Sequence, residues 1–131
     1  MSEPLSSESF NFRSGEFQML VRLKNLPENI TDDFAIIDLS GDLNLYSTEK
    51  VKECLNNVIG SGRDKIILDM QAVQHIDSSG LGAFLAIQVK LKKQGGFIKI
   101  SQPSERVLSI LELTKLRHFL KVVNSVEEGI S

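Results

Sequence analysis

Strand-like and helix-like segments alternate along most of this 131-residue chain, and this alternation constrains its fold more than any other feature. Two strand-like runs come first, and helical segments then separate the later ones. The runs are FQMLVRL (17–23), FAIIDLSG (34–41), DKIILDM (64–70), FIKIS (97–101) and HFLKVV (118–123). Strands joined through crossover helices lie parallel in their sheet. The order therefore predicts an α/β domain with a mixed sheet that is parallel in its later part.

The helical segments have apolar residues at three- and four-residue spacing, which is typical of helices packed on a sheet. Each has a side chain that can cap its first amides. The expected helices are residues 47–62 with Ser47 or Thr48 as cap, the segment from Asp77 to Gly95, a segment begun by Pro103 and Ser104, and a short terminal helix capped by Ser125. KNLPENITDD (24–33) predicts a long hairpin connection.

We expect one domain over residues 17–131, preceded by a flexible, Ser- and Glu-rich tail over residues 1–16. The net charge of −2 argues against direct binding to nucleic acid or to an anionic membrane. A single cysteine, Cys54, and two distant histidines allow neither an internal disulfide nor a convincing zinc site. No signal peptide or membrane span is recognisable. We expect a cytoplasmic protein. We expect it to bind no metal and no cofactor.

The stretch HIDSSGLGAFL (75–85) lies between a strand-like and a helix-like segment and gathers hydroxyl groups there. Asp77 is the predicted N-cap, accepting from the amide of Ser79 or Gly80. Ser78 then falls in the first helical turn, exposed at the edge where open α/β sheets meet ligands and partners.

Two glycines, Gly80 and Gly82, follow these serines, and each costs an exposed helix about 1 kcal/mol relative to alanine. Their presence indicates that something approaches this helix closely, either the sheet beneath it or a partner above it.

Ser78 has several possible roles: a catalytic nucleophile, part of a phosphate-binding site, part of a capped helix, or a phosphate acceptor. The G-x-S-x-G motif of a nucleophile elbow is absent, and His75 and Asp77 have no obvious geometry for activating Ser78. No phosphate-binding loop is present, although a helix N-terminus can hold an anion. A plain capped helix explains Asp77 but not the two exposed hydroxyl groups. Covalent phosphate on Ser78 is compatible with the helix dipole, which favours such a group by about 0.3–1 kcal/mol.

The string LDMQAVQHIDSSGLGAFL resembles the signature of STAS-domain proteins, the group of sulfate transporters and anti-sigma factor antagonists. Within this group, the chain resembles the stand-alone bacterial antagonists, and the resemblance covers residues 17–131. It implies a single mixed four- to five-stranded sheet with helices mainly on one face. It also implies that Ser78 is phosphorylated by an anti-sigma factor that is a serine kinase. The unphosphorylated form would bind that kinase and free a sigma factor, and a serine phosphatase would reset the switch. The chain itself would not be an enzyme.

The expected partner surface joins the Ser78 end of the helix to the loop after the second strand. It comprises Asp42, Asn44, Asp77, Ser78, Ser79, Gly80, Leu81 and Gly82, with Leu81 also fitting a core position. Asn44 stands where the family often has a carboxylate, which could alter partner choice. Two alternatives are a STAS scaffold or regulatory subunit of another signalling or transport complex, and a small-ligand or nucleotide binder.

Overall fold

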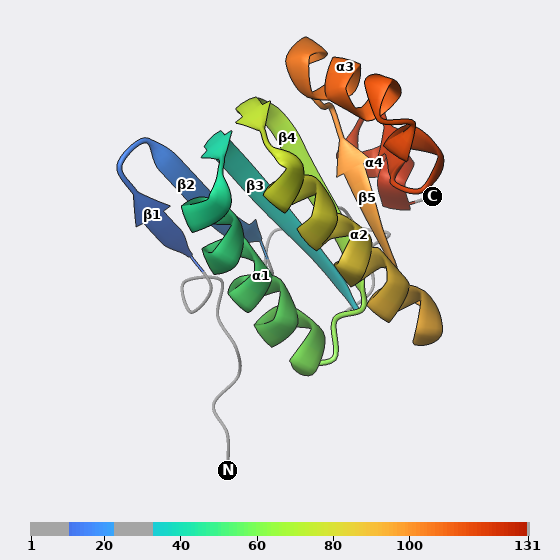
Figure 1. Cartoon of the computed structure of the whole chain (residues 1–131). Helices are drawn as coiled ribbons and strands as arrows, with labels where there is room; N and C mark the ends of the chain where they lie inside the picture. Colours follow the sequence, from blue (N-terminus) through green and yellow to red (C-terminus); the bar gives the residue numbers. More distant parts are fainter. Residues whose placement is uncertain (1–10, 23–32, 131) are drawn as a thin grey trace.

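The computed structural model describes residues 11–22 and 33–130, which form a six-stranded mixed sheet with helices packed on it (Figure 1). The strands lie side by side in chain order and are β1 (Phe12–Ser14), β2 (Phe17–Arg22), β3 (Phe34–Leu43), β4 (Lys65–Ile76), β5 (Phe97–Ser101) and β6 (Lys121–Val123). The first two pairings are antiparallel, and the three from β3 to β6 are parallel. The predicted mixed sheet, parallel in its later part, is confirmed.

The sheet has six strands where four to five were expected. The additional strand is β1, which lies within the expected tail over residues 1–16 and pairs with β2 through a turn at Gly15. The Phe12 and Phe17 rings pack with their centroids 6.1 Å apart. A three-residue strand is too short to show a sequence period, so only its pairing reveals it. Residues 1–10 of the tail and residues 24–32 of the connection lie outside the described residues.

The helices are α1 (Leu45–Gly60), α2 (Ser78–Lys93), α3 (Glu105–Leu113), the 3₁₀ helix η2 (Leu116–His118) and α4 (Val126–Ile130). The helix expected to begin at Pro103 and Ser104 is α3, and the Ser104 hydroxyl accepts from the Val107 amide. The cap predicted at Ser125 is confirmed, because its hydroxyl accepts from the Glu128 amide.

Several predicted boundaries are wrong. Strand β4 continues to Ile76, whereas the expected strand ended at Met70. Helix α1 begins at Leu45 instead of Ser47, since Asn44 provides its cap. The expected strand over residues 118–123 begins only at Lys121, because Lys115 has a φ of +60° and turns the chain into η2.

The main core lies between one face of the sheet and helices α1, α2 and α3. In β4, Ile66 and Leu68 face these helices, while Ile67 points to the opposite face, and all three are fully buried. Helix α4 lies behind β5 in Figure 1, with Gly129 against Ile67. The aliphatic run is therefore a strand covered on both faces, and most of the helical layer lies on one face, as expected.

Parallel pairing brings the starts of α1 and α2 together. The paired ends of β3 and β4 are Leu43 and Ile76, and each strand leads directly into its helix. The Asp77 amide donates to the Leu43 carbonyl at 3.1 Å. Two helix N-termini consequently lie side by side at one edge of the sheet, at the upper left in Figure 1.

Candidate functional site

Asp77 caps helix α2 as the sequence predicts. Its side chain accepts from the amides of Ser79 at 3.0 Å and Gly80 at 3.2 Å. The Ser79 hydroxyl also donates to the same carboxylate oxygen. One carboxylate therefore satisfies three donors that the first turn of the helix would otherwise leave open.

The hydroxyl groups of the two adjacent serines differ in exposure and in hydrogen bonding. Ser78 is the first residue of α2 and is exposed, whereas Ser79 is half-buried and bound to Asp77. Within residues 11–22 and 33–130, the Ser78 side chain makes no hydrogen bond. Its oxygen is thus available to react or to contact another molecule.

The capping network keeps Asp77 ionised. The Ser79 hydroxyl makes the largest contribution to lowering the pKa of the Asp77 carboxyl, helped by the two backbone amides and by His75, while partial desolvation opposes them. The edge beside Ser78 accordingly carries a fixed negative charge at neutral pH.

The two glycines of α2 have different surroundings. A Cβ atom on Gly80 would lie 2.8 Å from Ile76 Cγ1 and 3.4 Å from Thr48 Oγ1, so the close approach there is to the protein's own body. Among the described residues, nothing lies within 4 Å of a Cβ atom placed on Gly82, which is exposed. Packing within the protein therefore explains why residue 80 is a glycine, but it does not explain the glycine at position 82.

Asn44 has a structural role at the start of α1. Its side chain accepts from the Ser47 amide at 3.0 Å, and the Ser47 hydroxyl accepts from the Asn44 amide at 3.0 Å. Ser47 also donates to the Asp42 carbonyl at 2.8 Å. The prediction that Ser47 or Thr48 caps this helix is wrong, because both are buried inside its first turns.

Leu45 and Tyr46 are surface residues that the sequence analysis missed. They are 67% and 60% exposed in the first turn of α1. An open hollow of about 650 Å³ includes them and reaches Asp77, and its lining is Asn44, Leu45, Tyr46, Glu49, Lys50 and Asp77. The reciprocal Asn44–Ser47 spacing would have placed both residues in a first turn, had it been recognised as a capping box. Apolar side chains thus lie beside the charged edge.

Only some of the residues predicted for the partner surface are exposed to solvent. Asp42, Asn44, Ser78 and Gly82 are exposed, and Asp77 and Ser79 are half-buried. Leu81 is 6% exposed and belongs to the core cluster, and Gly80 is buried, so neither offers surface to a partner. We define the Ser78 edge as the exposed residues Asp42, Asn44, Leu45, Tyr46, Ser78 and Gly82 together with the half-buried Asp77 and Ser79.

Two observations concern hydrolytic and metal chemistry at this edge. No hydrogen bond joins His75 to Ser78 in the part of the chain that the structure describes. Among the same residues, no group of three His, Cys, Asp or Glu side chains is placed to hold a metal ion.

Of the helices in residues 11–22 and 33–130, none combines the length and apolarity that a membrane span needs.

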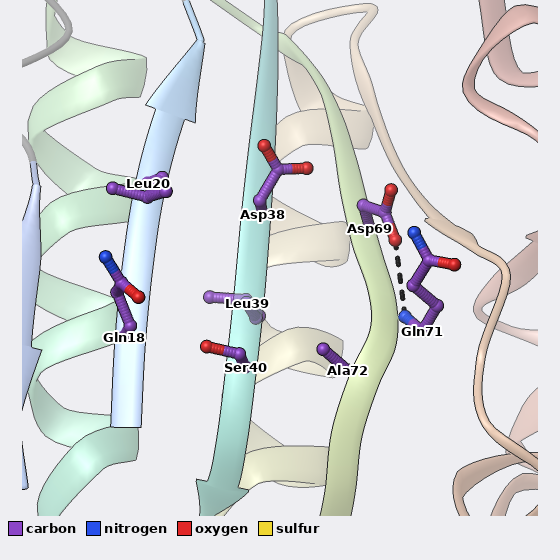
Figure 2. A pocket seen from close by; sticks show the side chains of 8 residues that line it. All are labelled: Gln18, Leu20, Asp38, Leu39, Ser40, Asp69, Gln71 and Ala72. Atoms are coloured by element: carbon purple, nitrogen blue, oxygen red, sulfur yellow. Dashed lines mark hydrogen bonds between the residues drawn. The ribbon is translucent and has the colours of Figure 1, made fainter. Parts of the chain in front are cut away.

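A second hollow, of about 220 Å³, lies on the sheet face turned away from α1 and α2 (Figure 2). Its polar side chains come from β2, β3 and β4 and include Gln18, Asp38, Ser40 and Asp69. Asp38 and Asp69 are neighbours in the parallel register, and Asp69 accepts from the Gln71 amide at 3.2 Å. This hollow is separated from the Ser78 edge by the sheet itself.

Residues 25–129 match the family model described as the STAS domain. The anti-sigma-B factor antagonist of Bacillus subtilis is 30% identical over 94 residues, which cover 72% of this chain and 85% of that protein. A crystal structure from Thermotoga maritima is 30% identical, with a TM-score of 0.70 and coverage of 76% and 86% of the two chains. The unphosphorylated form of SpoIIAA shares the fold with a TM-score of 0.66 at 23% identity, over 85% and 90% of the chains.

Proposed function

Because the chain belongs to the STAS-domain family, we propose that it is an anti-sigma factor antagonist whose binding is switched off by phosphorylation of Ser78. The observation that carries the proposal is the contrast between a free, exposed Ser78 hydroxyl and a Ser79 hydroxyl bound to Asp77. The role agrees with the name of the Bacillus subtilis relative. Its partner would be an anti-sigma factor that is also a serine kinase.

In the unphosphorylated form, the Ser78 edge would dock on that kinase and so release the sigma factor. Leu45 and Tyr46 offer apolar area for such a contact, and Asp42 and Asp77 offer negative charge beside it. Interfaces of this kind rely on a few buried aromatic or aliphatic anchors inside a polar rim. Gly82 supports a partner lying over α2, since no described part of the chain comes within 4 Å of a Cβ atom placed there.

Phosphoryl transfer would then reverse the docking. The Ser78 Oγ forms a bond to the γ-phosphorus of ATP, the bond from that phosphorus to ADP breaks, and the hydroxyl proton passes to a base of the kinase. ATP and Mg²⁺ belong to the kinase, and this chain supplies only the acceptor. A separate serine phosphatase would hydrolyse the phosphoserine and restore binding.

The added phosphate would spoil the interface without unfolding the antagonist. It carries about −1.5 to −2 charges at neutral pH, and the start of a helix tolerates such a charge. At a formed interface, a poorly paired charge costs about 2–5 kcal/mol. At about 1.4 kcal/mol per tenfold, this corresponds to a loss of affinity between about 30-fold and several thousandfold.

The proposal is tested by incubating the full chain with its candidate kinase and ATP and measuring the intact mass. We expect one added phosphate in the wild-type protein and in the matched control Ser79→Ala, and none in Ser78→Ala. Calorimetry should then show that Ser78→Ala binds the kinase and that Ser78→Asp binds at least about 30-fold more weakly. Phosphate on Ser78→Ala, or normal binding by a folded Ser78→Asp, would contradict the switch.

A further inference from the structure

A second exposed apolar surface lies between the middle of α2 and η2. Val89 and Phe119 are 57% and 64% exposed there. Leu85, four positions before Val89 on the same helix, and Leu116, three positions before Phe119, are partly buried and packed against the core. The Gln88 side-chain amide donates to the Phe119 carbonyl at 3.2 Å, which holds η2 beside α2. We call Leu85, Val89, Leu116 and Phe119 the α2–η2 face.

The two segments that carry this face are rich in basic residues, although Lys90 turns toward α1 and donates to Asn56 at 2.8 Å. Residues 85–93 and 110–121 contain six lysine or arginine residues and a single acidic residue, Glu112, although the whole chain has a net charge of −2. Lys92 and Lys93 follow Val89 by three and four positions, which places them near it on the helix surface. Lys115 and Arg117 flank Leu116, and Arg117 pairs with Glu112 at 2.7 Å. The segments that form the second apolar surface therefore carry an excess of positive charge.

This face is separate from the Ser78 edge. Val89 follows Ser78 by 11 positions along one straight helix, which corresponds to about 16 Å at 1.5 Å per residue. The Debye length at physiological ionic strength is about 8 Å, so the charge state of Ser78 is strongly screened at this distance. A molecule bound at Val89 and Phe119 would be largely insensitive to modification of Ser78.

We propose that the α2–η2 face is a docking surface for an acidic amphipathic helix of a protein partner, and that its affinity does not depend on the state of Ser78. Two short apolar ridges with lysine and arginine at their borders match a helix that presents leucine-like residues on one side and carboxylates at its margins. Charge complementarity distinguishes this occupant from a basic or neutral one.

An anionic membrane is the less fitting occupant. Outside these two segments the chain is net acidic, so a broad anionic surface would repel much of the molecule. A single helix contacts only the α2–η2 face and its basic border. The face would allow a partner such as a phosphatase to hold the antagonist in both states of the switch.

The test uses the full chain and a fluorescent synthetic peptide of about 18 residues, long enough to form a helix, with leucine on one side and glutamate on the other. We expect saturable binding by fluorescence anisotropy that weakens with added salt. Phe119→Ser and Val89→Ser should each weaken binding by about tenfold, as expected for an interface anchor. The double variant Lys92→Glu/Lys93→Glu should weaken it further than either.

Matched controls separate this surface from others. Leu20→Ser removes an apolar residue that is 40% exposed on the opposite sheet face, and it should leave peptide affinity unchanged. Ser78→Asp should change it by less than about twofold, because screening is strong at this distance. The proposal is overturned if the peptide does not bind, if binding survives Phe119→Ser, if a lysine-for-glutamate peptide binds equally well, or if phosphatidylglycerol vesicles are bound in preference to the peptide. Circular dichroism of each variant establishes that it is folded.

Discussion

The two glycines of α2 allow a matched pair of substitutions that separates fold from function. Gly80→Ala and Gly82→Ala add the same methyl group to the same helix, two residues apart. At Gly80 the methyl carbon would lie 2.8 Å from Ile76 Cγ1, whereas at Gly82 it would have open space around it. We expect the first change to destabilise the protein and the second to stabilise it.

The magnitudes follow from two opposing terms. Replacing a helical glycine by alanine contributes about 0.8–1.0 kcal/mol of stability at an exposed position. At Gly82 nothing offsets this gain, which corresponds to a rise in melting temperature of about 4 °C for a chain of this size. At Gly80 the methyl group presses on a β-branched side chain that is 2% exposed, and overpacking of this kind costs about 1–3 kcal/mol. The net change there is a loss of up to about 2 kcal/mol.

Urea denaturation followed by circular dichroism measures both effects. Gly82→Ala should raise the midpoint and Gly80→Ala should lower it, with unchanged slopes. The same Gly82→Ala protein should bind the kinase more weakly than wild type, although it is more stable, if a partner lies over α2. The reasoning fails if Gly82→Ala destabilises the fold, if Gly80→Ala stabilises it, or if the stabilised Gly82→Ala protein binds its partner as tightly as wild type.

Three further outcomes follow from the caps and the core. Asn44→Ala should lower the free energy of unfolding by about 1 kcal/mol in urea titrations, while Asn44→Asp, which keeps a cap, should lose much less; equal losses would contradict the capping role. Asp77 has a lowered pKa in the folded state, so its contribution to stability is present above about pH 4 and is lost as the pH falls through the folded value. The stability difference between wild type and Asp77→Asn should therefore shrink in acid, and a difference independent of pH would refute this. Burial, with a smaller effect of Glu53, raises the pKa of Cys54 to about 12, so the native thiol should resist alkylation near pH 8 and react in urea; rapid native-state reaction would show that it is accessible.

Local sequence signals predicted the order of elements and much of the Ser78 edge. The aliphatic run in β4 and the spacing of apolar residues in α2 specify a strand and a helix regardless of their surroundings. The cap at Asp77 involves only Ser79 and Gly80, two and three positions further on, so it could be recognised without a structure. The exposed position of Ser78 follows from that cap, because the first residue of a capped helix lies beyond the packed layer.

Tertiary structure decided the features that depend on contacts between distant segments. The sequence shows two similar glycines, but only the packing of Ile76 under α2 makes one of them necessary and leaves the other open. Leu45 and Tyr46 join Ser78 on one surface because β3 and β4 pair in parallel and end together. Phe119 becomes exposed beside α2 because the chain turns at Lys115 and forms η2 where the sequence predicted the start of a strand. Periodicity and capping act over a few residues, whereas the environment of a side chain is set by whichever distant segment packs against it.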